Sequence, residues 1–397
     1  MIGLRFLVLA SALLVTACSG VTRNALPADL HTDARVLGRN DLRAWGDVTS
    51  LEADTMIVEL ADQEAFIARA SGISDRPHNY LAISGGGANG AYGAGLLVGW
   101  SDMGTRPKFT VVTGISTGAL SAPFAFLGPD YDDQLREVYT SLGTDYVIKA
   151  RSPFKILGGD SVADSSPLAA TIERYITDDM IDAIAAQYRT GRQLLLGTTN
   201  LDAGRPVIWN IGRIADSGLP GAPALIRSVM LASASIPGAL PPVYIPVQGR
   251  DGKIYDEMHV DGGASTQVFL YPSGVDWDEA LDLLNVQGKP TAYVIRNSRL
   301  RPDYEPVDPK LIPIAARSID SMIRTQGIGD AFRILALAKR DGLELELTWI
   351  PKDAVEDTSD EPFDIDYMQD LFDYGYQRIQ AGEAWIDEDY VLENRGD

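Results

Sequence analysis

Apolar residues in this chain fall into short runs that fit strands and longer stretches with helical spacing. The first two strands are predicted at residues 79–84 and 109–113, and a glycine run (85–95) followed by a helical stretch (96–103) separates them. A strand, a glycine turn, a helix and a second strand within about 30 residues form a βαβ unit, in which the two strands are parallel. The sequence therefore predicts a parallel sheet.

The same alternation continues toward the C-terminus. Further strands are predicted at four apolar runs: 193–197, 206–209, 291–296 and 343–350. Helical periodicity marks six stretches: 50–71, 167–176, 179–188, 223–232, 316–338 and 368–379. Alternating elements of this kind predict an α/β domain in which helices cover the sheet.

Composition narrows the classes of protein to which the chain can belong. Of its 397 residues, 45% are hydrophobic, which is enough to build a large buried core. Its formal net charge is −21. Nucleic-acid-binding proteins present a basic surface to phosphates, so DNA and RNA are excluded as partners.

The N-terminus has the pattern of an export signal. Arg5 precedes an apolar run, residues 6–15, which has the length of a signal-peptide core and is too short to span a membrane as a helix. The run leads into Val15-Thr16-Ala17-Cys18, which resembles a bacterial lipobox, and Cys18 is the only cysteine of the chain. An ordinary signal peptide followed by a chance cysteine is the alternative.

We therefore expect three segments. Residues 1–17 form a lipoprotein signal peptide, residues 18–45 form a lipidated N-terminus and tether, and residues 46–397 form the globular domain. Lipidated Cys18 would attach the protein to a membrane of the bacterial cell envelope. The residue after the cysteine is Ser19 rather than Asp. The absence of Asp at this position resembles lipoproteins that are sorted to the outer membrane.

A candidate nucleophile follows the second predicted strand. The pentapeptide Gly114-Ile115-Ser116-Thr117-Gly118 stands between this strand and a helix-compatible run, 119–127. A nucleophile elbow requires this strand-turn-helix setting, because the two glycines keep side chains out of the sharp turn that exposes the serine hydroxyl. Ser116 is therefore the predicted nucleophile.

The glycine run Gly85-Gly86-Gly87-Ala88-Asn89-Gly90 allows three interpretations. A dinucleotide site requires an acidic residue at the end of the next strand, which here ends in Thr113-Gly114, so a cofactor is disfavoured. A plain tight turn is the second interpretation. The third is an oxyanion hole, in which backbone N–H groups face the charge that develops beside the serine.

The histidine inventory directs the search for a base to the carboxylates. The chain has three histidines, His31, His78 and His259, and none follows His259 to complete a Ser…Asp…His order. Asp261, followed by Gly262 and Gly263, stands at a predicted strand end and could approach the serine. Asp is a weaker base than His, with an ordinary pKa of about 3.9 against about 6.5, so this arrangement needs strong oxyanion stabilisation. His259 is the alternative base.

Taken together, the three glycine-containing blocks resemble those of the patatin-like phospholipases, with a motif core at residues 79–264. A further block, residues 231–243, is similar as well. The resemblance implies a three-layer α/β/α fold with a mainly parallel central sheet, and a Ser116/Asp261 dyad. It also implies oxyanion N–H groups on Gly85, Gly86 and Gly87, and no metal or organic cofactor. The remaining motif glycines are Gly90, Gly114, Gly118, Gly262 and Gly263.

Two positions depart from the family pattern. Many members carry Asp before the glycine triplet and Arg within the block, where this chain has Ser84 and Asn89. Without that Arg, the glycine block offers no positive charge to a substrate phosphate. The expected activity is hydrolysis of a lipid acyl ester, with a lipid or phospholipid as substrate and with the lipid class and oligomeric state left open. The alternatives are a catalytically silent envelope lipoprotein that acts as a binding or assembly module, and a serine thioesterase or peptidase.

Overall fold

The computed structural model describes most of the chain. The described residues are 23–47, 68–152, 156, 159–270, 281–300, 304, 306–352 and 354–387. The expected signal segment, Cys18 and most of the predicted helix at 50–71 lie outside them. Within the described ranges, no helix is both long enough and apolar enough to cross a membrane.

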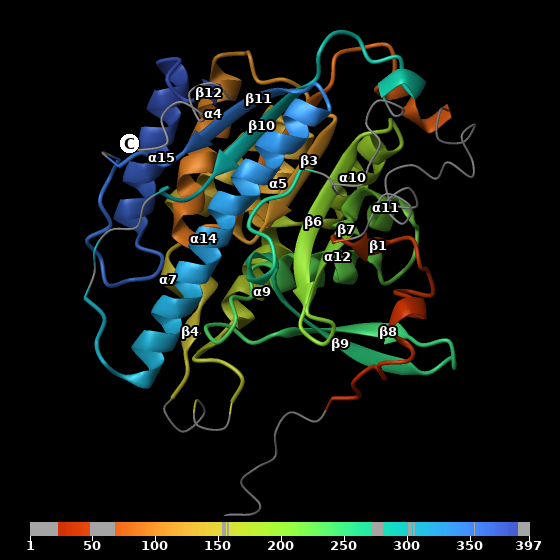
Figure 1. Ribbon diagram of the computed structural model, residues 1–397, viewed down its shortest axis with the longest axis vertical. Helices are drawn as coiled ribbons and strands as arrows, with labels where there is room; N and C mark the ends of the chain where they lie inside the picture. The colour runs from red at the N-terminus through yellow and green to blue at the C-terminus, as the bar shows by residue number, and fades with distance from the viewer. Residues whose placement is uncertain are drawn as a thin grey trace, which may run out of the picture.

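One ten-stranded sheet organises the described part of the chain (Figure 1). Its centre is parallel and consists, in spatial order, of β6 (Gln193–Asn200), β3 (Val111–Ile115), β2 (Asn79–Ile83), β10 (Thr291–Arg296) and β11 (Glu344–Trp349). Antiparallel strands flank this centre: β7 (Arg205–Asn210), β1 (Arg43–Trp45), β12 (Ile386–Asp387), β9 (Ile254–Asp261) and β8 (Val243–Gln248). The predicted α/β class and the mainly parallel central sheet are confirmed.

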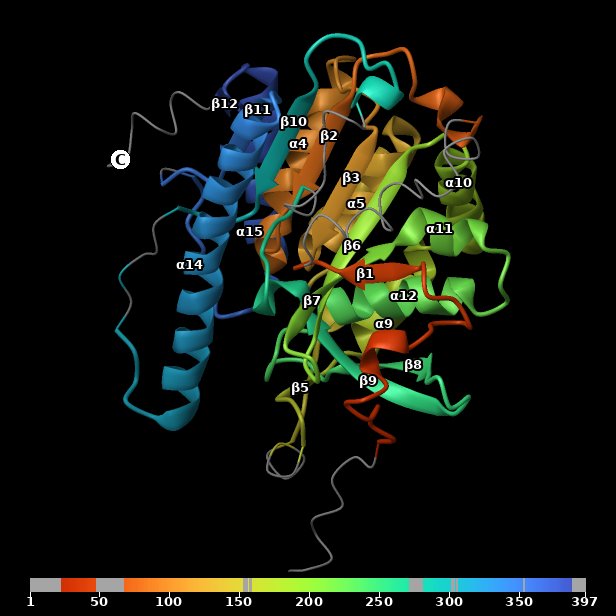
Figure 2. The same cartoon turned by 45° about the vertical axis from the view of Figure 1, so that its right-hand side comes forward.

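Successive side chains of the central strands point to opposite faces of the sheet, and both faces are buried. Leu81 and Ile83 of β2 enter the larger core, whereas Tyr80 and Ala82 enter a second core on the opposite face. The larger core lies under helices α4 (Gly90–Asp102), α5 (Thr117–Leu127), α6 (Asp132–Thr140), α9 (Ser166–Tyr175), α10 (Asp178–Tyr188), α11 (Ile211–Asp216), α12 (Ala222–Ser233) and α15 (Ile365–Gln380). The second core lies under α14 (Leu311–Arg340), which gives the three predicted layers (Figure 2).

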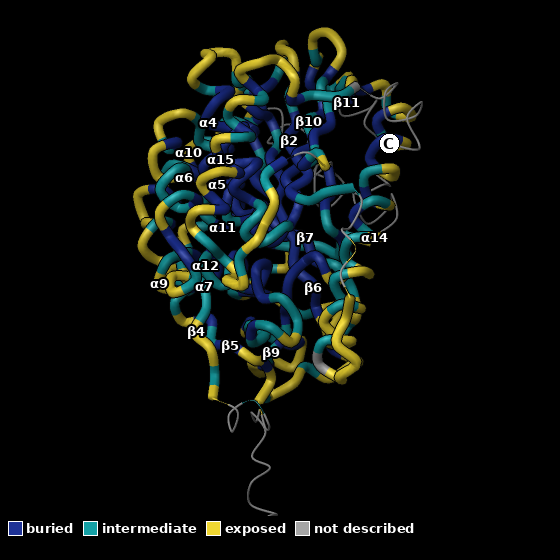
Figure 3. Tube along the Cα trace, turned by 90° about the vertical axis from the view of Figure 1, so that its left-hand side faces the viewer, coloured by how far each residue is buried: buried dark blue, intermediate teal, exposed yellow. Residues whose placement is uncertain are grey.

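Only the C-terminal half of α14 is packed on the sheet. Ile334, Leu335 and Ala338 are buried there, whereas Leu311 and Met322 in the other half are exposed (Figure 3). Figure 2 shows this first half of the helix beside the carboxyl ends of the parallel strands. The short elements α7 (Thr144–Val147), β4 (Lys149–Ala150) and β5 (Ala163–Asp164) lie toward the same end of the molecule (Figures 1 and 2).

Helix α4 begins earlier than the sequence predicts. The glycine run was expected to extend to Gly95, but the helix starts at Gly90. A Cβ atom at Gly95 would lie 2.0 Å from the carbonyl oxygen of Phe372 in α15, and one at Gly99 would lie 2.7 Å from a side-chain carbon of Ile379. Both glycines therefore serve close helix packing; the assignment of residues 90–95 to a turn was wrong, whereas Gly99 lies in the predicted helix.

Candidate active site

The carboxyl edge of the sheet gathers four segments that are distant in the sequence. Residues 84–87 follow β2, Ser116 follows β3, and Arg296 ends β10. Strand β9 runs the other way and ends at Asp261, opposite Thr198 of β6. All four segments line one cavity of about 780 Å³. In open α/β sheets, ligands bind outside the carboxyl ends of the strands, so this cavity is the candidate site.

Ser116 occupies a strained backbone conformation at the sharp turn between β3 and α5. Its φ of 56° and ψ of −126° lie in a region that residues with a side chain rarely adopt. A Cβ atom at Gly114 would lie 2.4 Å from the Gly118 carbonyl oxygen, and one at Gly118 would lie 2.3 Å from the Ile83 carbonyl oxygen. The structure thus has the strand-turn-helix geometry that was predicted around Ser116, and this geometry requires both glycines.

A second serine holds this turn in place. The backbone N–H of Ser116 donates to Oγ of Ser233, 3.0 Å away, and that hydroxyl donates to the carbonyl oxygen of Gly197 at 2.6 Å. Ser233 ends α12 and is fully buried. One hydroxyl therefore satisfies two buried backbone groups and links the turn to β6.

Asp261 is a buried carboxylate beside this serine. Its Oδ1 accepts a hydrogen bond of 2.7 Å from the Gly263 N–H, and its own N–H donates to the Ser235 carbonyl oxygen at 2.9 Å. Burial raises the pKa of Asp261 to about 6, although hydrogen bonds from the Ser116 side chain and the Gly263 N–H act in the opposite direction. A pKa near 6 is suited to accepting a proton close to neutral pH.

The two glycines after Asp261 allow close packing of the chain. A Cβ atom at Gly262 would lie 2.6 Å from the Gly197 carbonyl oxygen, and one at Gly263 would lie 2.2 Å from Nε2 of Gln267. A side chain at Gly262 would therefore press the turn after Asp261 away from the backbone of β6, whereas one at Gly263 would displace the amide end of the Gln267 side chain.

The glycine triplet after β2 is held by Asn297, which follows β10. Asn297 donates from Nδ2 to the Ser84 carbonyl oxygen at 3.1 Å, and a Cβ atom at Gly86 would lie 2.1 Å from the Asn297 carbonyl oxygen. The Gly85 N–H already donates to the Gln267 carbonyl oxygen at 3.2 Å. Among the residues that the structure describes, no acceptor pairs with the N–H of Gly86 or Gly87. The oxyanion role predicted for the triplet therefore stays a prediction for these two groups.

The departures from the family pattern have structural roles of their own. Ser84 accepts a hydrogen bond from the Asn297 N–H at 2.9 Å, and Asn89 accepts one from the Tyr367 hydroxyl at 2.6 Å. A Cβ atom at Gly90 would lie 2.2 Å from Oγ1 of Thr117, so this motif glycine lets α4 approach the residue that follows Ser116.

None of the three histidines faces the cavity. His259 is fully buried, with Nδ1 3.0 Å from Oγ1 of Thr198 and Nε2 3.1 Å from a carboxylate oxygen of Glu257. Burial lowers the pKa of His259, and the hydrogen bond to Glu257 opposes this effect. His78 bonds to Tyr80 and Ile73, and His31 bonds to a backbone carbonyl, so none of the histidines lies beside Ser116, whereas the Asp261 carboxylate does. Across the described ranges, no cluster of His, Cys, Asp or Glu is arranged to hold a metal ion.

A second cavity of about 310 Å³ also reaches Ser116. It shares five lining residues with the larger cavity: Gly87, Ser116, Val162, Ile236 and Ala239. Its other walls are mainly apolar and come from α5, α9, α12 and the segment before α15, including Leu120, Phe124, Leu168, Ile172, Met230 and Phe363. The serine hydroxyl therefore lies where a wide cavity meets a narrower apolar one.

Sequence reasoning missed several residues that build this site. Ser233 lies in the block that resembles the family, but its role depends on a contact 117 positions away in sequence. Asn297 and Arg296 end a strand that was predicted at the correct position, and polar residues at the carboxyl end of a parallel strand were a usable signal. Arg324 lies within a long helix whose pattern gives no such signal.

A serine on a strained turn at the carboxyl edge of a mainly parallel sheet, beside a buried carboxylate, defines an α/β protein built on a nucleophile elbow. Residues 81–271 match the family described as patatin-like phospholipase. Over this segment, which is just under half of the chain, the match confirms the resemblance to patatin-like phospholipases that the motifs predicted.

Individual relatives are distant. Two patatin-like phospholipase domain-containing proteins, from two strains of Cryptococcus neoformans var. neoformans serotype D, are each 28% identical over 189 residues. The matched segment is 46% of this chain but only 20% and 19% of those proteins, so the chain spans about a fifth of their length.

Two solved structures are similar at low identity. VipD from Legionella pneumophila has a TM-score of 0.37 and 12% identity, with 77% of this chain and 66% of that chain covered. Human GIVD cytosolic phospholipase A2 has a TM-score of 0.32 and 11% identity, with 67% of this chain and 49% of that chain covered.

Proposed function

We propose that this protein hydrolyses acyl esters of lipids, with Ser116 as nucleophile and Asp261 as general base. The observation that carries the proposal is the position of Ser116. It stands on a strained turn beside a carboxylate whose pKa burial raises to about 6, at the meeting point of two cavities. The match of residues 81–271 to the patatin-like phospholipase family supports a lipid substrate.

The reaction follows from these positions. Oγ of Ser116 attacks the ester carbonyl carbon and its proton passes to the Asp261 carboxylate, while the N–H groups of Gly86 and Gly87 stabilise the oxyanion. The alcohol then leaves with the proton from Asp261, and the acyl group stays on Ser116. Water attacks this acyl-enzyme and Asp261 takes its proton; the bond between Ser116 Oγ and the acyl carbon then breaks, Asp261 returns the proton to Oγ, and the fatty acid is released.

The two cavities suit the two parts of such a substrate. The narrower cavity is almost entirely apolar, as a fatty acyl chain requires. The wider cavity carries the polar and charged side chains Asn89, Arg296, Ser298 and Arg324. We therefore place the acyl chain in the first cavity and the alcohol portion in the second.

A substrate panel tests this proposal. Fatty-acid release from a phospholipid, a neutral glyceride and an acyl thioester, and amine release from a peptide, would be measured. The proteins compared are the wild type, Ser116→Ala and the control Ser141→Ala, whose side chain is exposed. We expect ester hydrolysis and labelling by a serine-reactive phosphonate in the wild type and in Ser141→Ala, and neither in Ser116→Ala. Absence of labelling in folded wild-type protein would refute the proposal and favour a catalytically silent module. Preferential cleavage of the thioester or the peptide would show that the substrate is a thioester or a peptide rather than a lipid ester.

We further propose that the protein is a bacterial envelope lipoprotein attached through Cys18, in the outer membrane. Support comes from the lipobox-like sequence before this single cysteine. The tether predicted for residues 18–45 is shorter in the structure: Asn24 donates from its backbone N–H to Asp256 at 3.1 Å, and Leu30 and Leu42 are buried in the larger core, so the packed domain begins well before residue 46. Cys18→Ser should move the expressed protein from the membrane fraction to the soluble fraction, and unchanged membrane recovery would refute lipid anchoring.

A further inference from the structure

Arg296 is a buried guanidinium in the wide cavity whose charge is not fully paired. It ends β10, is 2% exposed and lines the cavity together with Ser116. Its Nη1 has no hydrogen-bond partner among the described residues, and its Nη2 makes a long bond of 3.4 Å to the Arg324 carbonyl oxygen. A buried cation without a full set of acceptors is costly, so an acceptor from a ligand would stabilise it.

Asp330, the acid whose charge acts on Arg296, makes its hydrogen bonds and its ion pair with other residues. Oδ2 of Asp330 accepts hydrogen bonds from the backbone N–H groups of Gln267 and Val268, at 2.6 and 3.4 Å. Its Oδ1 pairs with Arg333 at 3.0 Å. Burial and the charge of Arg324 lower the pKa of Arg296 to about 10, and Asp330 opposes this only in part, so Arg296 is still cationic at neutral pH.

Arg324 brings a second guanidinium to the same cavity from helix α14. Its Nη2 donates to Asp320 at 3.0 Å, while its Nε is buried without a partner among the described residues. The helix passes close to Arg296, because a Cβ atom at Gly327 would lie 3.5 Å from Arg296 Nη2. Asp320 is the one carboxylate besides Asp261 in the described lining, so this part of the cavity has an excess of positive charge.

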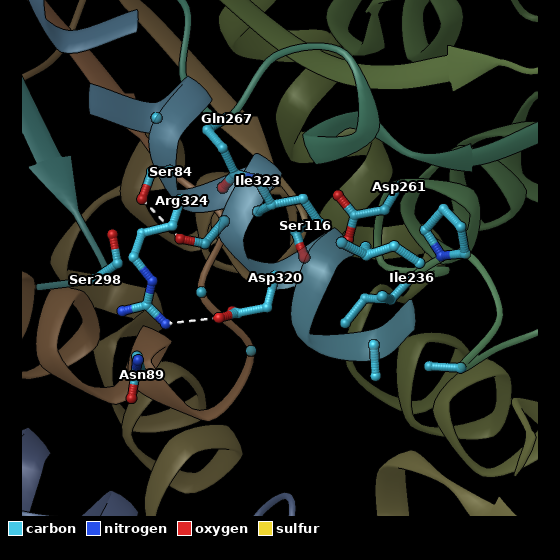
Figure 4. Close-up of a pocket in the computed structure, with 18 of the residues that line it drawn as sticks. Ser84, Asn89, Ser116, Ile236, Asp261, Gln267, Ser298, Asp320, Ile323 and Arg324 are labelled. Atoms are coloured by element: carbon cyan, nitrogen blue, oxygen red, sulfur yellow. Dashed lines mark hydrogen bonds and ion pairs between the residues drawn. The ribbon is translucent and has the colours of Figure 1, made fainter. Parts of the chain in front are cut away.

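The charged groups lie apart from the apolar wall. In the view of Figure 4, Arg324, Ser298 and Asn89 lie on one side of Ser116, and Asp261 and Ile236 lie on the other. Ile236 also lines the apolar cavity. A ligand with its ester at Ser116 and its acyl chain in the apolar cavity would therefore direct its other end toward the arginines.

We propose that Arg296 and Arg324 form an anion subsite that binds the phosphodiester group of a glycerophospholipid whose acyl ester is held at Ser116. Guanidinium groups bind phosphate oxygens through paired N–H donors, and a phosphodiester would supply the acceptors that Arg296 Nη1 and Arg324 Nε lack. The glycine block has Asn89 in place of the Arg found in many relatives, and this subsite provides the missing charge from β10 and α14. The inference rests on the proposed function, because it places the ester at Ser116.

The test compares two substrates that differ in the phosphate. Rates would be measured on dioctanoylphosphatidylcholine and dioctanoylglycerol in neutral detergent micelles, and the ratio of the two kcat/KM values would be taken. In Arg296→Gln we expect this ratio to fall at least tenfold, with Arg296→Lys recovering part of it. Arg324→Gln should lower the ratio less, because Asp320 already neutralises part of its charge. Arg340→Gln, at the far end of α14, is the matched control and should leave the ratio unchanged.

Two outcomes would overturn the subsite: a ratio in Arg296→Gln and Arg324→Gln equal to that of the wild type, or a parallel loss on both substrates. If Arg296→Gln does not fold, Arg324→Gln, whose side chain is partly exposed, carries the test. Binding of dihexanoylphosphatidylcholine to Ser116→Ala, measured by calorimetry, separates this proposal from the enzymatic one. If binding depends on Arg296 but the wild type hydrolyses no ester, the anion subsite is supported and the proposed hydrolase activity is refuted. If the wild type hydrolyses esters but the ratio of kcat/KM values is unchanged in the arginine variants, the hydrolase activity is supported and the subsite is refuted.

Discussion

Replacing Asp261 by Asn should stabilise the folded protein at alkaline pH while it removes the proposed base. Burial raises the pKa of Asp261 to about 6 from an ordinary value of 3.8, so the folded state binds this proton more tightly than the unfolded state does. The protonated carboxyl therefore stabilises the folded state relative to the unfolded state. This contribution to the free energy of unfolding is fully present below pH 3.8 and is lost as the pH rises through 6. An Asn does not ionise, so it keeps this stability at every pH.

The size of the effect follows from the shift. About two pKa units at 1.36 kcal/mol per unit amount to about 3 kcal/mol in the free energy of unfolding above pH 6. Asn can still accept the 2.7 Å hydrogen bond from the Gly263 N–H, so the substitution leaves the turn intact. At pH 8 the variant should therefore exceed the wild type by up to about 3 kcal/mol, and near pH 4 the two should be equal.

Urea denaturation followed by tryptophan fluorescence at pH 8 and pH 4 measures this difference. Asp360→Asn, at an exposed position, is the control and should change little at either pH. The reasoning is refuted if Asp261→Asn is less stable than the wild type at pH 8, or if the difference between them does not depend on pH. Ester hydrolysis by the same variant should be abolished. Asp261 would then lower the stability of the folded protein at alkaline pH while it is required for activity.

Three further predictions concern the same site. The kcat/KM for a soluble ester should fall about tenfold per pH unit below about pH 6, because Asp261 must be ionised to accept the serine proton; a profile flat to pH 5 would contradict this. Ser233→Ala leaves two buried backbone groups unpaired and should lower the free energy of unfolding by about 1–3 kcal/mol, with a loss of kcat in the same assay. Gly118→Ala forces a Cβ to 2.3 Å from the Ile83 oxygen and should lower the melting temperature by several degrees, whereas Gly329→Ala, with open space around it, should not.

Local pattern in the sequence was sufficient to predict the parts of the site that depend on neighbouring residues. The elbow at Ser116 depends on a contiguous strand, two glycines and a helix, and these occur in the predicted order, with the strand and the start of the helix each displaced by two residues from the predicted bounds. Strand β10 was also predicted at its observed bounds. In contrast, the antiparallel direction of β7 and β9 depends on pairing with β6, and an apolar run carries no information about direction.

Contacts between distant segments account for what the sequence did not predict. Asn297 clamps the glycine loop from 213 positions away, and the Gly85 N–H is occupied by the Gln267 carbonyl. Gly95 and Gly99 of α4 allow the close approach of α15, and the glycine pattern alone cannot distinguish such a packing role from a turn. Each of these features is a property of the tertiary packing rather than of a local stretch.

In the proposed mechanism, burial of Asp261 would allow a carboxylate to take the role that histidine has in other serine hydrolases. An ordinary Asp, with a pKa of about 3.9, is a weaker proton acceptor than His by about 2.6 units, but a pKa near 6 removes most of this difference. The causes that set the pKa of Asp261 include no nearby cation, so the shift depends on the cavity excluding water and charge from this side. An anion subsite on the opposite side of Ser116 is compatible with this requirement, because its arginines can bind a charged group without lowering the pKa of the base.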